Sequence, residues 1–282
     1  MGWAGHRGDF VAKTVAGITA SLERAVFTEE QARLPGLLQG IDPRAKVAAA
    51  LLLLVGVGLA RHLPPVVAAY VVTVLLGLAS RLPLGEFSRR VWLGIPLFAG
   101  FVAFPSLVML PGAPLLVLWG GPPLPLVVTD NGLASVLLFV SRVGTSVAIA
   151  LLLVTTTRWT DLLAALRVLR VPESFLVVLA MTYRYLFLFL RSANSLFQAR
   201  ASRTVGETSG AEQRRWAAAA AGTLASRSMK MSTDVLLAME ARGFGGEIRS
   251  SRPPRMRDGD RFFLALSVVL AAGLLLADSW MA

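Results

Sequence analysis

The residues that could carry out chemistry are few, and they are not grouped. The chain has no cysteine, and its two histidines, His6 and His62, lie far apart, so they cannot form a Cys/His metal cage. A phosphate-binding loop needs a lysine directly after a glycine, but Lys13, Lys46 and Lys230 follow Ala12, Ala45 and Met229. We therefore expect a non-catalytic chain that binds no cofactor or metal ion of its own.

Two other functional classes are suggested by scattered charges. Glu29, Glu30 and Arg33 approach the Glu-Glu-x-x-x-Arg pattern of an intramembrane protease, but the spacing is one residue short. Arg142 is the only clear ionisable group in the middle of an apolar segment, where a stand-alone secondary transporter would place its relay groups. No carboxylate accompanies it on that segment, so we interpret Arg142 as a structural anchor for a backbone carbonyl or a partner helix.

The composition indicates a membrane protein. Of the 282 residues, 55% are hydrophobic and 16% are charged, which is too apolar for an ordinary soluble domain. We predict an all-α polytopic membrane protein with about five transmembrane helices, the first of which acts as the insertion signal into the cell inner (plasma) membrane. These helices are expected at residues 46–60, 63–80, 91–110, 132–157 and 262–280.

The formal net charge of +11 is strongly segregated, and this sets the predicted orientation. The loop at 81–90 contains three arginines, whereas the loop at 111–131 contains no basic residue. Short cytoplasmic loops retain Lys and Arg, so the first loop is placed inside and the second outside. The N-terminus is then cytoplasmic and the C-terminus external. The basic excess suits the inner membrane face and gives no reason to expect a nucleic acid partner.

Four regions follow from this topology. Residues 1–44 form an N-terminal cytoplasmic or interfacial segment with apolar side chains at helical spacing, namely Val11, Val15, Ile18, Leu22 and Val26. Residues 45–157 form a membrane domain with four transmembrane helices. Residues 158–261 are cytoplasmic and helical, with 17 basic and 9 acidic side chains. Residues 262–282 form the C-terminal transmembrane helix.

One apolar run complicates this topology. Residues 175–190 are almost all apolar, but a helix of that length measures about 24 Å, less than the thickness of a bilayer core. Arg184 also lies in its middle. We therefore predict that this run packs against the membrane domain without crossing it; if it crosses, the C-terminus moves to the cytoplasm.

Two cytoplasmic helices are each expected to end in an exposed arginine. In the second of them, one face carries Leu224, Ser228, Met231, Val235 and Met239 at spacings of three or four. Arg242 continues this face, the small Ala241 permits close approach of another backbone, and Gly243 can supply a left-handed helix cap. The preceding helix ends similarly with Ser202, Arg203 and Thr204, and Arg200 competes with Arg203 for the equivalent position.

These residues carry a resemblance to a known family. Ala-Met-Glu-Ala-Arg-Gly-Phe at 238–244 resembles the second Ala-Arg-Gly signature of the transmembrane coupling components, EcfT, of energy-coupling-factor ABC transporters. Three other segments resemble its cobalt-type member CbiQ: residues 41–46 (Ile-Asp-Pro-Arg-Ala-Lys), 169–172 (Leu-Arg-Val-Pro) and 183–186 (Tyr-Arg-Tyr-Leu). The resemblance covers about 40–280. At the first signature, Ser202-Arg203-Thr204 replaces Ala-Arg-Gly.

The resemblance implies that the helices within 158–261 are coupling helices. The ATPase-coupling residues would be Ser202, Arg203, Thr204, Ala241, Arg242 and Gly243. Two CbiO-like ATP-binding-cassette subunits would bind ATP and Mg²⁺, and a CbiM-like membrane subunit, with a possible small CbiN-like subunit, would bind cobalt. The same role for nickel or a vitamin is the alternative within this class, because the selective site lies on another chain.

Overall fold

The computed structural model describes residues 17, 20, 32, 36–119, 126–204, 209–246 and 256–281. The predicted N-terminal amphipathic helix lies largely outside these residues. The chain divides by packing into two units, one containing Leu166–Arg252 together with the N-terminal stretch Met1–Glu30, and the other containing Gln31–Ala165 and Pro253–Ala282. We call them the basic unit and the membrane unit, and each is described by itself.

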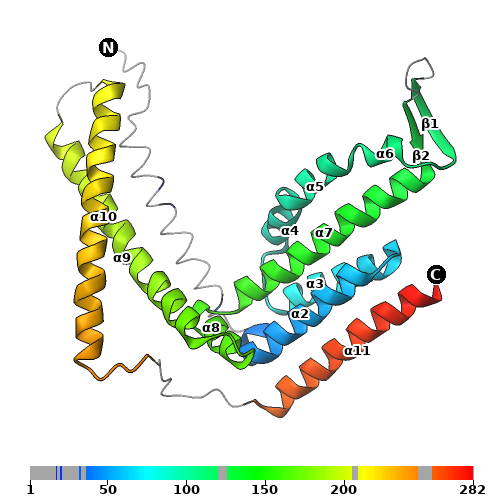
Figure 1. The fold of residues 1–282 in the computed structure, drawn as a ribbon. Helices are drawn as coiled ribbons and strands as arrows, with labels where there is room; N and C mark the ends of the chain where they lie inside the picture. The colour runs from blue at the N-terminus through cyan, green and yellow to red at the C-terminus, as the bar shows by residue number, and fades with distance from the viewer. Residues whose placement is uncertain are drawn as a thin grey trace. The chain divides into compact units, whose positions relative to one another are not determined.

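Four long helices form the core of the membrane unit (Figure 1): α2 (Pro43–Leu59), α3 (Leu63–Ala79), α7 (Asp130–Thr156) and α11 (Asp258–Trp280). They agree with four of the five predicted helices. Local signals set where they begin: the Asp42 side chain accepts from the Arg44 N–H at the start of α2, and the Thr129 hydroxyl accepts from the Gly132 N–H at the start of α7. Apolar side chains such as Val57, Val66 and Ile149 fill the space between the helices.

The predicted single helix at 91–110 is wrong. The structure replaces it with α4 (Leu84–Trp92), α5 (Ile95–Ala103) and α6 (Ser106–Met109). Gly94 has φ −100° and ψ −113°, outside the helical region. Pro96 and Pro105 bring no N–H to continue the helical ladder. The chain therefore breaks at both places.

The broken segment still follows α7 from one end to the other (Figure 1). Its first helix lies beside Thr155, close to the C-terminus of α7. Its last helix approaches Gly132 near the N-terminus of α7, so closely that a Cβ there would lie 2.7 Å from the Leu107 carbonyl oxygen. The predicted path of the chain is retained, while the predicted continuity is not.

A β-hairpin takes the place of the loop predicted at 111–131. Strands β1 (Pro114–Trp119) and β2 (Leu126–Thr129) pair antiparallel, with Pro114 opposite Thr129. Runs of Leu and Val with a terminal Trp or Thr favour extended structure, and the expectation of a plain loop overlooked this. Apart from this hairpin the described residues are predominantly helical, and the all-α class is confirmed.

Three of the described helices are long and apolar enough to cross a membrane: α7, α11 and α9 (Glu173–Arg203). Helices α2 and α3 have 17 residues each, slightly short of a full span unless their flanking residues lie at the headgroup level. The 31-residue length of α9 removes the argument that its apolar run is too short. That α9 does not cross the membrane stays a prediction.

Two aspartates of α11 bind the two ends of α2. Asp260 accepts from the Asp42 N–H at 2.8 Å. Eighteen residues later, Asp278 accepts from the Arg61 and His62 N–H groups, each at 2.8 Å, and lies 2.9 Å from His62 Nδ1. Eighteen residues are five helical turns, so both carboxylates lie on one face of α11. We call Asp260 and Asp278 the carboxylate staple, because they fix α11 along the length of α2.

Two basic side chains tie α7 to α2 in the same unit. Lys46 is buried, and its Nζ donates to the Thr156 carbonyl at 2.9 Å. The Arg142 guanidinium donates to the carbonyl of Ala60, the residue that ends α2. The interpretation of Arg142 as an anchor for a backbone carbonyl is therefore confirmed. Each cation satisfies a carbonyl that a helix end leaves without an intrahelical partner.

Candidate functional site

The first arginine-bearing helix end is the C-terminus of α9. Arg203 is the last helical residue, and Thr204 follows as the cap, with its N–H bonded to the Arg200 carbonyl at 3.0 Å. The hydroxyls of Ser202 and Thr204 turn back to carbonyls of the last turn, at Ala199 and Arg200. Arg203 is exposed, and its guanidinium has no hydrogen bond or ion pair with any described residue.

The second helix end lies after α10 (Gly210–Glu240), at Ala241, Arg242 and Gly243. Gly243 has φ +80°, and two bonds close the motif: the Phe244 N–H to the Met239 carbonyl at 3.0 Å, and the Gly243 N–H to the Glu240 carbonyl at 2.9 Å. This is a Schellman cap, as the sequence predicts for Gly243. Arg242 directly precedes the cap and is exposed; within the described ranges its side chain has no ion pair.

The predicted face of α10 is also confirmed. Its members are half-buried, whereas every other residue from Ala221 to Glu240 is exposed; the face consists of Leu224, Ser228, Met231, Val235 and Met239. Helical periodicity alone is enough to find such a face.

The structure distinguishes Arg200 from Arg203. Arg200 lies one turn before the end of α9, with its guanidinium carbon 5.2 Å from the centroid of the Trp216 ring and Nη2 3.3 Å from Oε1 of Glu212. Its side chain is 20% exposed. Arg200 is thus engaged within the basic unit, while Arg203 is exposed and has no ion pair with the described residues.

The two arginine-bearing ends do not lie together. Helix α10 starts just after the end of α9, crosses α9 near the connecting loop, and continues away from it (Figure 1). Its 31 residues correspond to about 46 Å, so Arg203 and Arg242 lie near opposite ends of α10. A single ligand of ordinary size cannot contact both.

Sequence reasoning missed the partners of Arg200, namely Glu212, Trp216 and Phe197. A signal was available, because these residues are placed almost symmetrically about the loop between α9 and α10. Counted from residue 206, Phe197 and Trp216 lie nine and ten residues away, and Arg200 and Glu212 each lie six residues away. In a helical hairpin, residues at equal distances from the loop face one another.

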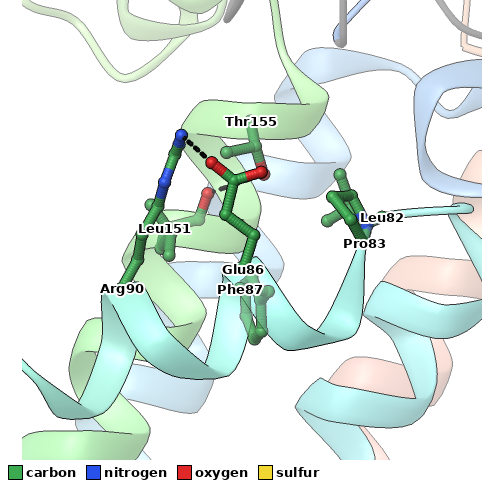
Figure 2. A pocket seen from close by; sticks show the side chains of 7 residues that line it. All are labelled: Leu82, Pro83, Glu86, Phe87, Arg90, Leu151 and Thr155. Atoms are coloured by element: carbon green, nitrogen blue, oxygen red, sulfur yellow. Dashed lines mark hydrogen bonds and ion pairs between the residues drawn. The ribbon is translucent and has the colours of Figure 1, made fainter.

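No described residues form a plausible metal site, since nowhere in these ranges do three His, Cys, Asp or Glu side chains gather. Figure 2 shows a small pocket of the membrane unit between α4 and α7, bounded by Leu82, Phe87 and Thr155. At its edge Glu86 Oε1 accepts from Arg90 Nη2 at 2.6 Å, an exposed pair one helical turn apart. One carboxylate already paired with an arginine is not a metal ligand set.

The fold and these helix ends define a multi-pass helical membrane protein with exposed basic helices. Comparison with known proteins makes this specific: the cobalt transport protein family CbiQ matches residues 37–254. The cobalt transport protein CbiQ of Rhodobacter capsulatus is 30% identical over 236 residues, which cover 79% of this chain and 90% of the relative. An uncharacterized protein of Methanocaldococcus jannaschii is 32% identical over 268 residues, covering 94% and 91%. The chain belongs to the CbiQ family.

Proposed function

We propose that this chain is the transmembrane coupling subunit of an energy-coupling-factor importer. It would link ATP hydrolysis by two partner ATPases to the uptake of cobalt through a separate substrate-binding membrane subunit. Membership of the CbiQ family supports a role in cobalt transport. The absence of a phosphate-binding loop and of cysteine from the sequence supports the placement of ATP hydrolysis and metal selection on other chains.

The observation that carries the proposal is the pair of exposed arginines, Arg203 at the end of α9 and Arg242 just after the end of α10. A guanidinium offers a planar set of donors to a carboxylate or to backbone carbonyls. Because the whole of α10, about 46 Å long, follows Arg203 and precedes Arg242, the two arginines suit two separate protein surfaces, as a pair of ATPases would present. Movement of the ATPases on binding and hydrolysing ATP would then displace the two helix ends and, through α9 and α10, the substrate-binding subunit.

This role implies a location and an orientation. The chain would lie in the cell inner membrane with its N-terminus and the basic region 158–261 in the cytoplasm, where the ATPases are. The basic residues near 81–90 and the lack of them near 111–131 support this orientation.

The decisive experiment is uptake and ATPase co-purification for variants of the two arginines. Arg203→Ala and Arg242→Ala should reduce both, and the corresponding Glu variants should reduce them further because charge reversal adds repulsion. If each guanidinium is desolvated against a carboxylate, truncation removes about 2–5 kcal/mol of coupling free energy. If the contact stays hydrated, the loss is smaller.

Arg227→Ala is the matched control, since Arg227 is also exposed on α10 but lies 15 residues before Arg242. It removes the same charge from the same helix and should leave uptake unchanged. Wild-type cobalt uptake by the Arg242→Glu protein would refute the proposed coupling contact.

A further inference from the structure

Helices α9 and α10 are joined by a cluster of four side chains beside the loop that connects them. The rings of Phe197 and Trp216 meet edge to face, with centroids 4.9 Å apart and an interplanar angle of 73°. The guanidinium of Arg200 lies over the Trp216 ring, 5.2 Å from its centroid, and pairs with Glu212. We call Phe197, Arg200, Glu212 and Trp216 the aromatic lock.

Trp216 is the centre of the lock. It contacts both α9 side chains, whereas the Arg200–Glu212 pair involves a carboxylate that is mostly exposed and is therefore screened by water. Stacking of a guanidinium on an indole is stronger when the cation is partly desolvated, as Arg200 is. Two small buried residues, Ala193 and Ala220, each lie one turn further from the loop than Phe197 and Trp216, which suits close approach of the two backbones there.

Away from the lock the helices diverge (Figure 1). Where the helices are apart, both expose large apolar side chains, including Val178 on α9 and Met229 and Leu237 on α10. Among the described residues, the ring contacts and ion pairs between α9 and α10 are those of the lock. The ring contacts and the ion pair that join the two helices are therefore concentrated in a short region at one end of each.

We propose that the aromatic lock is the pivot that fixes the angle between α9 and α10, and that Trp216 is the positioning residue for Arg242. Twenty-six residues separate Trp216 from Arg242, a lever of about 39 Å. A rotation of about 10° at the pivot would displace Arg242 by about 7 Å over that lever, enough to remove it from a partner surface. The geometric part stands on the structure alone, and its consequence for transport rests on the proposed function.

The geometry can be tested in the full chain, which is free of native cysteine. Spin labels on Val178→Cys and Met229→Cys, whose native side chains are 62% and 76% exposed, report the separation of the diverging arms by pulsed electron paramagnetic resonance. Trp216→Ala should broaden the distance distribution and shift its mean by up to about 3 Å, because a rotation of about 10° changes the label separation by no more than its effect over the shorter arm, the roughly 20 Å from Trp216 to Met229. Trp216→Phe should restore most of the parent distribution.

Trp280→Ala is the matched control, because Trp280 is 91% exposed and lies in the membrane unit; it should leave the distribution unchanged. A Trp216→Ala distribution that superimposes on the parent would overturn the proposal. Because Trp216→Ala could unfold the helical hairpin of α9 and α10, Arg200→Met provides a second test. This variant keeps the length of the side chain but removes the charge that stacks on Trp216. It should give a smaller broadening, and an unchanged distribution would also count against the lock.

The functional consequence is measured separately in the assembled transporter. Trp216→Ala retains Arg203 and Arg242 but displaces Arg242 from its partner surface, so ATPase co-purification should fall as it does for Arg242→Ala, and cobalt uptake should fall at least several-fold. A changed distance together with wild-type uptake would refute the link from pivot to transport. Failure of the parent chain itself to co-purify with ATPases would instead refute the proposed function, leaving the distance result intact.

Discussion

Removal of Asp278 should destabilise the membrane unit without affecting any partner surface. Its carboxylate accepts from the Arg61 and His62 N–H groups and contacts the His62 ring, all in the turn between α2 and α3. In Asp278→Ala, two backbone donors and one side-chain donor lose their acceptor. A donor left unsatisfied costs roughly 1–3 kcal/mol. Because this turn is only partly buried, we expect a loss of about 2–4 kcal/mol in total.

The assay is unfolding of the purified chain in mixed detergent micelles with increasing sodium dodecyl sulfate, followed by circular dichroism. Asp258→Ala is the matched control, because it removes a carboxylate from the same helix. The Asp258 side chain is fully exposed, and its ion pair with Arg261, at 3.4 Å, is open to solvent. Such a pair contributes little, so the control should shift the unfolding free energy by less than about 0.5 kcal/mol.

The staple also predicts additivity. Asp260 binds the Asp42 and Arg257 N–H groups at the other end of α2, about 27 Å from Asp278 along the helix. Substitutions this far apart act independently. The decrease in unfolding free energy of the Asp260→Ala/Asp278→Ala double variant should therefore equal the sum of the decreases for the two single variants. An Asp278→Ala protein as stable as the Asp258→Ala protein would refute the reasoning.

Three further predictions concern the helix end, the topology and the ligands. Gly243→Ala should cost about 1 kcal/mol at the end of α10, because a Cβ there meets no atom within 4 Å but φ is +80°; Gly245→Ala, without a positive φ, should have no effect, and amide hydrogen exchange of α10 compares them. A Met281→Cys protein should be labelled by a membrane-impermeant maleimide only from outside the cell, whereas labelling only from the cytoplasm would show that α9 crosses the membrane. Calorimetry on the isolated chain should detect neither ATP nor Co²⁺ binding, and a micromolar affinity for either would contradict the expectation that ATP hydrolysis and metal selection lie on other chains.

Local features of the sequence were sufficient for most helices. Asp42 and Pro43 at the start of α2, Thr129 at the start of α7 and Gly243 at the end of α10 act through the backbone within one turn. Such signals depend on neighbouring residues alone, and hydrophobic content indicates the lipid environment without reference to the fold. The class of protein, the helix ends that carry Arg203 and Arg242, and the half-buried face of α10 were therefore predictable.

The breaks in the segment 91–110 and the β-hairpin at 114–129 were harder to predict from the sequence. Gly94, Pro96 and Pro105 are visible in the sequence, but glycine and proline occur within many membrane helices because neighbouring helices satisfy the freed backbone groups. Whether they break the helix is decided by packing, and here the segment bends along α7, with Gly132 allowing the Leu107 carbonyl to approach closely.

What the sequence by itself determined is most of the long helices and the distribution of charge along the chain, because periodicity, caps and charge act over a few residues. Only the tertiary structure decided which charged groups contact other helices and which are exposed. Arg200 and Arg203 are three residues apart in the same basic stretch, yet Arg200 is bound by Trp216 and Glu212 from the next helix, and Arg203 is exposed. Asp260 and Asp278 likewise gain their role from contacts with residues more than 200 positions away. The physical reason is that a hydrogen bond or a stacked ring pair requires two groups within a few ångströms, and only the folded chain brings such groups together.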